Sequence, residues 1–287
     1  MNIKMTERKG EFLVGLALAL RGSSLLFAKI AMRTMGPFLV MGTRFLIAFI
    51  VIGALFHKSL ARVTKKELWH CTLLGFFFFL SMGFELYGLR TTPSSVTSFL
   101  EGAVVIIVPV MTCIVQRKLP DKATVISAVI AMVGIAFLTL KGDHIGFTAG
   151  ELLVLGGTIW YSTTVLITDT AAKNDDPMVV AIYQLLFIAL FAFLGAFLFE
   201  EVRIPSSGAE WGSILALALI CSGVGFTLQP LGQKYCSPER AGLLTVFNPL
   251  MAASLGVLFL NEHLTLSLVI GGILIIVSIL TPAWIKK

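Results

Sequence analysis

The strongest constraint on this chain is a succession of apolar stretches, each about 20 residues long. They occupy residues 12–32, 37–56, 68–89, 94–115, 123–140, 149–171, 178–199, 211–233, 239–260 and 265–285. About 20 apolar residues in helical form cross the hydrocarbon core of a bilayer, and a helix satisfies the backbone groups that lipid cannot. We therefore predict an all-α integral membrane protein with ten transmembrane helices.

Composition and motifs argue against several functional classes. Hydrophobic residues make up 57% of the 287 residues and charged residues 13%, about half the charged share of a typical soluble domain. The short connections leave no room for a separate catalytic or nucleic-acid-binding domain. Metalloprotease, hydrolase, Walker and dinucleotide-binding motifs are absent, and the four histidines and four cysteines show no metal-ligand spacing. We expect no enzymatic activity, no cofactor, no metal and no nucleic-acid partner.

The basic residues indicate how the chain is oriented. If the ten stretches alternate in direction, fifteen lysines and arginines fall on the N-terminal side of the membrane and four on the opposite side. The remaining three, Arg21, Lys29 and Arg44, lie inside predicted helices. Because cytoplasmic loops carry the excess of basic residues, we predict a multi-pass membrane protein with both termini in the cytoplasm.

The two halves of the chain resemble each other weakly. A shift of 140 residues superimposes helix starts and prolines, and a shift of 145 continues the match after one five-residue insertion. The matches are Gly10–Val14 on Gly150–Val154, Ser23 on Thr163, Pro37 on Pro177, Pro93 on Pro238 and Leu119 on Leu264. We therefore predict a first five-helix repeat over residues 1–145 and a second over 146–287.

Five helices per repeat is an odd number, so the second repeat enters the membrane from the opposite side. Such inverted repeats allow secondary transporters to alternate access around a site near the bilayer midplane. The alternative is a duplication kept only for its structural role.

Five charged residues lie at helix depth in the first half. At 1.5 Å of rise per residue, Arg44, Glu101, Glu85 and Lys29 lie roughly 10, 12, 7 and 6 Å from the outer face, and Arg21 roughly 18 Å. Placing a charged side chain within the membrane costs several kcal/mol unless it is paired or hydrated, so each such residue is a candidate functional residue. Arg21 could hold a carboxylate or phosphate, and Glu101 could carry a proton. The alternative is that Arg44, Glu85 and Glu101 only form neutralising ion pairs that fix helix packing.

Polar and aromatic residues extend the candidate site into the second half. They could line an amphipathic pocket, although aromatic residues are equally common in lipid-facing belts. The candidate substrate-binding residues are Arg21, Ser24, Glu101, Trp160, Tyr161, Gln229 and Asn248, and the candidate ion-pair or coupling residues are Arg44, Glu85 and Glu101.

At the level of motifs, the chain resembles the drug/metabolite transporter superfamily, in particular its ten-helix EamA-type members. The resemblance covers nearly the whole chain. It rests on Arg21-Gly22-Ser23-Ser24 with Lys29, Pro37 with Arg44, Thr97–Gly102 leading to Pro109, Pro238–Ala241, Asn248-Pro249-Leu250 and Asn261-Glu262-His263-Leu264.

The resemblance implies a central cavity lined by helices 1 to 4 and 6 to 9, with helices 5 and 10 at the periphery. It also implies export or exchange of amino acids or related metabolites across a bacterial plasma membrane. Arg21 stands where the family usually has an aromatic residue, and Glu101 adds an acid; both departures favour a polar, carboxylate-bearing substrate.

We therefore predict a secondary transporter that moves small polar metabolites by alternating access. A multidrug or lipid-linked-solute carrier is the first alternative, and a passive channel is the second. The expected partners are a small-molecule substrate and the lipid bilayer, and the pattern is compatible with proton coupling and with a homodimer.

Overall fold

The computed structural model describes residues 7–57, 63–104, 107–108, 110–111, 114, 117, 122–138, 140–141, 144–145, 147–226, 228, 244 and 247–285. Helices dominate these residues, which confirms the all-α class. The helices are α1 (Glu7–Gly22), α2 (Ser24–Ala31), α3 (Pro37–Leu55), α5 (Lys65–Leu89), α6 (Ser94–Glu101), α8 (Lys122–Leu138), α9 (Ala149–Asn174), α10 (Pro177–Phe199), α11 (Gly208–Leu215), the π-helical η1 (Ala216–Val224), α14 (Phe247–Leu260) and α15 (Leu266–Ile285).

One small departure from the all-helical prediction follows α8. The two-residue strands β1 (Leu140–Lys141) and β2 (His144–Ile145) pair antiparallel. The predicted fifth span at 123–140 therefore ends inside this hairpin, because Leu140 already belongs to β1.

Helix length supports insertion in a membrane. Within the described part of the chain, five helices are long and apolar enough to cross a bilayer: Arg8–Ala31, Pro37–Leu55, Lys65–Leu89, Ala149–Ile167 and Met178–Phe199. Shorter apolar helices occupy Lys122–Phe137, Gly208–Val224, Phe247–Leu260 and Leu266–Thr281. Each lies within or close to a predicted span. The count of ten crossings stays a prediction.

Local sequence signals place several helix starts. Pro37 is the first residue of α3, where its missing N–H costs no hydrogen bond. Asp176 caps α10 by accepting from the Met178 backbone N–H. Thr64 and Glu67 form a capping box at the start of α5. These caps satisfy backbone donors that would otherwise be unpaired at the helix ends.

Equivalent helices of the two predicted repeats run antiparallel against each other. Glu200, just after α10, accepts hydrogen bonds from the Phe38 and Leu39 backbone N–H groups at 2.8 and 3.0 Å, so α10 ends where α3 begins. Ser127 near the start of α8 donates to the Ser278 carbonyl late in α15. An inverted repeat requires this opposition. The boundary between residues 145 and 146 stays a prediction.

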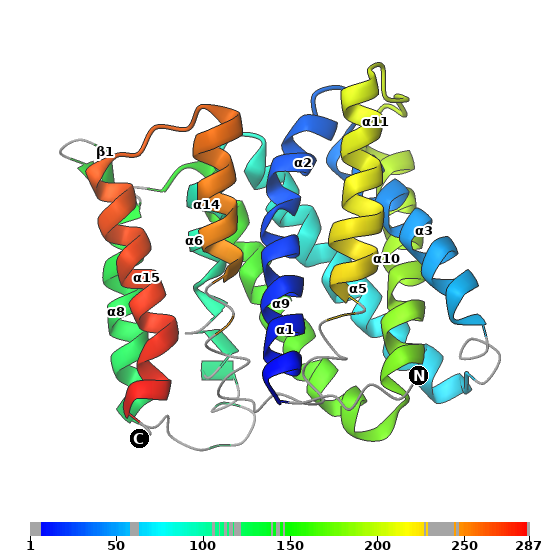
Figure 1. Ribbon diagram of the computed structural model, residues 1–287, viewed down its shortest axis with the longest axis horizontal. Helices are drawn as coiled ribbons and strands as arrows, with labels where there is room; N and C mark the ends of the chain where they lie inside the picture. The colour runs from blue at the N-terminus through cyan, green and yellow to red at the C-terminus, as the bar shows by residue number, and fades with distance from the viewer. Residues whose placement is uncertain are drawn as a thin grey trace.

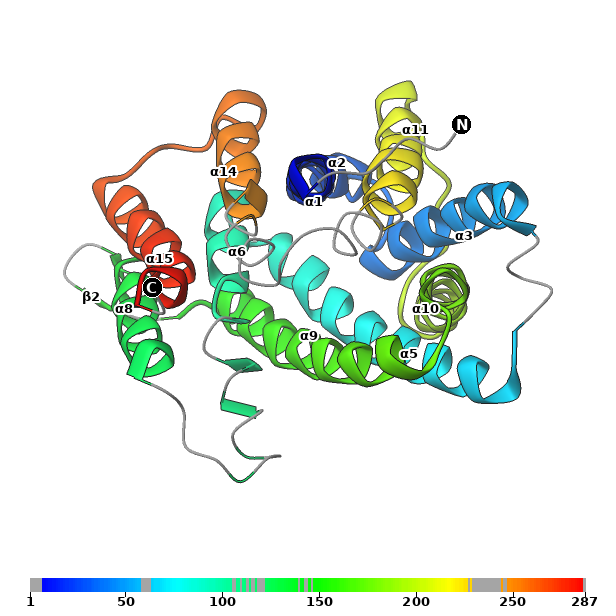
Figure 2. The same ribbon diagram turned by 60° about the horizontal axis from the view of Figure 1, so that its bottom comes forward.

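Helices α8 and α15 stand together at one edge of the bundle (Figures 1 and 2). Phe99 and Leu100 of α6 pack against Ala131 of α8 and Ile275 of α15, and join this pair to the remaining helices. The fifth and tenth predicted helices are therefore peripheral, as expected. Helices α1, α3, α5, α9, α10, α11 and α14 lie beyond α6 and, together with it, surround the interior.

In Figure 1, α1 begins and α15 ends at the same end of the bundle. We call the opposite end, where α3 and α6 begin, the outer end, after the orientation predicted from the basic residues.

Among the described helices, α5 and α9 share the most extensive contact, and glycines lie along it. A Cβ atom on Gly157 would lie 2.8 Å from the Ser81 carbonyl oxygen, and one on Gly88 would lie 2.6 Å from the Gly150 carbonyl oxygen. Both obstacles are backbone atoms, which cannot rotate away. Small residues therefore set the distance between these helices, as is common inside membranes.

This contact predicts the effect of Gly157→Leu. The added side chain must separate α5 from α9, and overpacking of this kind costs about 1–3 kcal/mol. We expect a lower apparent melting temperature of the detergent-solubilised protein, measured by fluorescence-detected size exclusion. Gly212→Leu is the matched control, because nothing lies within 4 Å of a Cβ atom at that glycine. Equal melting temperatures for the two variants would contradict the prediction.

Candidate functional site

Four charged side chains from four helices meet inside the bundle. Arg21 comes from α1, Arg44 from α3, Glu85 from α5 and Glu101 from α6. The carboxyl groups of Glu85 and Glu101 interact with each other, and Arg21 interacts electrostatically with both. Arg44 interacts with Glu85. The structure thus brings together four of the five charged residues that the sequence placed at helix depth, all except Lys29; we call these four the charge cluster.

Arg44 is buried, with 3% of its surface exposed. Its Nη2 donates to the Met82 sulfur at 3.4 Å, and its Cζ lies 4.5 Å from the centre of the Phe45 ring. Among the described residues, Nε and Nη1 find no hydrogen-bond partner. A guanidinium offers five N–H donors, so most of the capacity of Arg44 to donate is unused.

Three further buried atoms share this condition within the described part of the chain. They are Oγ1 of Thr92, just after α5, Oε1 of Glu101 and Oγ of Ser222 on η1. Buried polar atoms in folded proteins are nearly always hydrogen-bonded, and a group of exceptions in one region calls for an explanation. The region has unmatched donors on Arg44 and an unmatched acceptor on Glu101, which is the complement of a solute that carries both a carboxylate and an ammonium group.

Helix geometry is irregular where the cluster lies. A turn at Ser23 separates α1 from α2 directly after Arg21 and Gly22, and the Ser23 hydroxyl donates to the Leu20 carbonyl at 2.6 Å. Helix α6 ends at Glu101. The helix that begins as α11 widens into η1, which carries Ser222. Interrupted helices and π-helical turns are typical of binding sites within membranes and of functional sites in general.

An aromatic cluster borders the charges. The rings of Phe45, Phe78 and Phe226 lie 5.6–6.2 Å apart, and Tyr161 meets Phe78 edge-on at 6.1 Å. The guanidinium of Arg21 lies 5.1 Å from the centre of the Phe226 ring. Such a border excludes water and strengthens the electrostatic interactions beside it.

The other sequence candidates have mixed positions. Ser24 begins α2 beside the interruption, and Asn248 packs on α1, where a Cβ atom on Gly22 would lie 3.1 Å from its Oδ1. Trp160 stacks on Phe77 with 6.0 Å between the rings, away from the Phe78 contact of Tyr161. Gln229 lies outside the described residues.

Several residues of the site escaped the sequence interpretation. Phe45, Phe78, Phe226 and Ser222 gave no signal there, because one more phenylalanine or serine in an apolar stretch is unremarkable. Gly22 was noted there only as part of the motif Arg21-Gly22-Ser23-Ser24.

Glu262 organises the outer end. It follows α14 and accepts from the backbone N–H and hydroxyl groups of Ser94 and Ser95, at 2.6–3.0 Å, where α6 begins. Lys29 of α2 contacts the same carboxylate at 3.2 Å. Burial raises the pKa of Glu262, but the hydrogen bonds from Ser95 and Ser94 outweigh burial and hold it below its usual range. Only a family motif had singled out Glu262 in the sequence, and Lys29 had no assigned partner.

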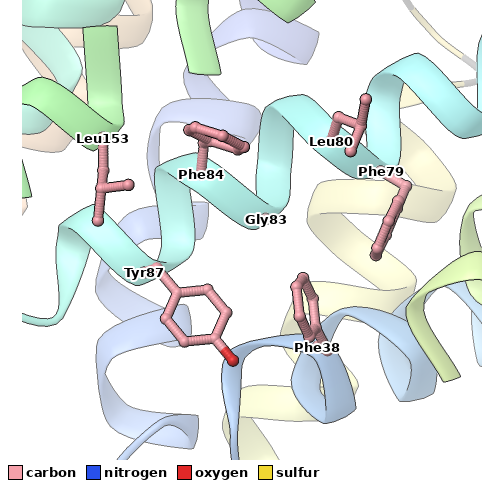
Figure 3. Close-up of a pocket in the computed structure, with 7 residues that line it drawn as sticks. All are labelled: Phe38, Phe79, Leu80, Gly83, Phe84, Tyr87 and Leu153. Carbon is pink, nitrogen blue, oxygen red and sulfur yellow. The ribbon is translucent and has the colours of Figure 1, made fainter. Parts of the chain in front are cut away.

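A separate apolar groove of about 230 Å³ lies along α5, between α3 and α9. In Figure 3, the rings of Phe79 and Phe38 face each other, while the hydroxyl of Tyr87 points towards α3. That hydroxyl donates to Glu200 at 2.8 Å. The lining residues are Phe38, Phe79, Leu80, Gly83, Phe84, Tyr87 and Leu153. The groove includes no member of the charge cluster. Its apolar lining would suit an apolar group such as a lipid acyl chain.

Comparison with known proteins gives the chain a context. The sequence model of the EamA-like transporter family matches residues 8–140 and, separately, residues 148–281. The chain is 26% identical over 282 residues to the uncharacterized transporter YetK of Bacillus subtilis, covering 91% of this chain and 84% of YetK. It is 26% identical over 237 residues to the threonine/homoserine exporter RhtA of Salmonella typhimurium, covering 79% and 73%.

A crystal structure with 20% sequence identity superposes with a TM-score of 0.71 and covers 96% of both chains. At this identity, the likeness supports the fold alone.

The Glu262 contacts predict a pH-dependent stability. Because its folded pKa lies below the unfolded value, ionised Glu262 stabilises the fold at neutral pH, and this contribution is lost as the pH falls through the folded pKa. We expect Glu262→Gln to lower the apparent melting temperature at pH 7, and the difference from wild type to shrink by pH 4. Glu201→Gln, which changes an exposed carboxylate, serves as control. A difference that stays constant over this pH range would contradict the assignment.

Proposed function

This chain belongs to the EamA-like transporter family, and on that premise we propose that it is a secondary transporter of small polar metabolites, namely amino acids or related carboxylates. Transport by alternating access, location in the bacterial plasma membrane with both termini in the cytoplasm, and the absence of enzymatic activity are parts of this proposal.

The observation that carries the proposal is the set of unmatched polar atoms in the charge cluster. Nε and Nη1 of Arg44 can donate to a carboxylate, and Oε1 of Glu101 can accept from an ammonium group. A zwitterionic amino acid presents both groups a few ångströms apart. A purely hydrophobic cation would leave the arginine donors unmatched. Leaving a buried neutral group unsatisfied costs about 1–3 kcal/mol, and a charged guanidinium costs more.

Charge balance supports a carboxylate in particular. Two arginines face two carboxyl groups that interact with each other, and two adjoining carboxyl groups can share one proton. With a shared proton the cluster would carry one net positive charge, which a substrate carboxylate would neutralise. Charge neutrality lowers the cost of holding the site in a low-dielectric interior.

The inverted arrangement supplies a means of movement. Helices α1, α3, α5 and α6 each bring one charge, so a change in their relative tilt would alter the cluster and the route to it together. Interrupted helices at Ser23 and Glu101 provide points at which the outer and inner segments can tilt separately. A relative's name, threonine/homoserine exporter, supports the substrate class at low identity.

Counterflow in proteoliposomes tests the proposal. Vesicles preloaded with a mixture of unlabelled amino acids should transiently accumulate a labelled one from outside. We expect Arg21→Ala and Arg44→Ala to reduce this accumulation to below about a tenth of wild type, because either change removes a positive charge that would hold the substrate carboxylate. Arg203→Ala, at an exposed arginine that contacts Glu201, should behave as wild type. Accumulation retained in both cluster variants would overturn the site.

The groove in Figure 3 favours the second candidate, a multidrug or lipid-linked-solute carrier, because it is apolar and aromatic. The same vesicles distinguish the two. Counterflow of hydrophobic cations, without counterflow of any amino acid, would support that candidate; flux with no counterflow of any solute would instead indicate a channel.

Proton coupling is a separate part of the proposal and has its own test. If the Glu85–Glu101 pair exchanges its proton during transport, amino-acid uptake will respond to an imposed pH gradient. We expect Glu101→Gln to abolish that response, because an amide cannot release a proton. Glu201→Gln should leave it unchanged. An equally pH-dependent Glu101→Gln variant would remove this residue from coupling.

A further inference from the structure

A second polar cavity lies at the outer end, away from the charge cluster. It has a volume of about 270 Å³ and lies between the ends of α2, α5 and α14. Its polar lining consists of Lys29, Arg33 and Arg90, and its apolar lining of Met32, Leu89 and Leu260. No acidic side chain lines it.

The three basic side chains differ in their partners. Lys29 contacts Glu262 at 3.2 Å. For Arg33 and Arg90, the described residues provide no ion pair and no side-chain hydrogen bond. Three positive charges therefore face one carboxylate. A concave surface with surplus positive charge concentrates anions, and a guanidinium group can donate two parallel N–H bonds to a pair of oxygens of a carboxylate or phosphate.

Glu262 is held mainly by other groups. Its two oxygens accept four hydrogen bonds from Ser94 and Ser95 at the start of α6. An anion in the cavity can therefore draw Lys29 away from Glu262 without stripping that carboxylate of its donors. Among the described residues, Lys29 is the one cation that lines the cavity and also contacts Glu262, the carboxylate bound to the start of α6.

We propose that this outer cavity is a second anion-binding site, which takes the carboxylate or phosphate group of a small molecule on Arg33 and Arg90 and shares Lys29 with Glu262. The site goes beyond the proposed transport function and does not depend on it. Binding there would weaken the Lys29–Glu262 contact, through which α2 is linked to the start of α6. Helix α2 follows Arg21 and α6 ends in Glu101, so this contact lies next to two helices of the charge cluster.

Isothermal titration of the purified full-length protein with inorganic phosphate, in neutral detergent at constant ionic strength, tests the site directly. We expect the double variant Arg33→Gln/Arg90→Gln to bind phosphate at least about tenfold more weakly than wild type. Both side chains are exposed, so folding should be unaffected. Arg203→Gln is the control for loss of an exposed outer arginine. Wild-type affinity in the double variant would overturn the proposal.

Glu262→Gln gives a test of opposite sign. It removes the carboxylate that competes for Lys29, so we expect phosphate to bind about threefold more tightly. A purely structural role for Glu262 would leave the affinity unchanged or lower it, and either result would overturn the sharing of Lys29.

The source of the anion is decided in nanodiscs. If phosphatidylglycerol, compared with phosphatidylcholine alone, suppresses phosphate binding by the wild type, a lipid headgroup is the occupant in membranes. Undiminished binding would indicate dissolved anions. Absence of phosphate binding in both detergent and phosphatidylcholine nanodiscs would overturn the site altogether. Because none of these measurements involves transport, they stand whether or not counterflow is observed.

Discussion

The structure depends on the mutual neutralisation of charges that lipid cannot solvate. Arg21, Arg44, Glu85 and Glu101 come from four helices, and each would be very costly alone in the interior. Their convergence fixes where α1, α3, α5 and α6 can lie relative to one another. The same convergence leaves donors and acceptors that the described residues do not satisfy. Packing and binding are therefore consequences of one electrostatic requirement, and a change of helix positions must alter both.

The outer end shows a second use of charge. Two carboxylates of the second half cap helices of the first: Glu200 binds the backbone at the start of α3, and Glu262 binds that of α6. Helix N-termini carry partial positive charge and unpaired N–H groups, so a carboxylate there is favourable. These contacts join the halves at the outer end beside apolar ones such as the Phe38–Phe199 ring pair. Polar contacts of this kind can break and re-form as water enters, which would suit the alternating access proposed above.

Membrane insertion and the approximate helix limits followed from the sequence, because lipid imposes one length and one backbone geometry on each span. The common depth of Arg44, Glu85 and Glu101 also followed, since rise per residue is constant in a helix. The direction in which each side chain points around its helix axis did not follow from the sequence. Tyr161 and Trp160 are neighbours in the chain, yet Tyr161 joins the aromatic cluster and Trp160 stacks on Phe77, because successive helical residues point about 100° apart.

The amino-acid sequence alone indicates that this protein lies in a lipid bilayer, that its fold is all-α, and which charged residues need a partner there. Tertiary structure decided which charges meet. Lys29 and Glu262 are separated by 233 positions and no local pattern links them; they pair because α2, α6 and the segment after α14 come together at the outer end. Local propensity and lipid act on each helix separately, whereas the choice of partner depends on how all the helices pack at once.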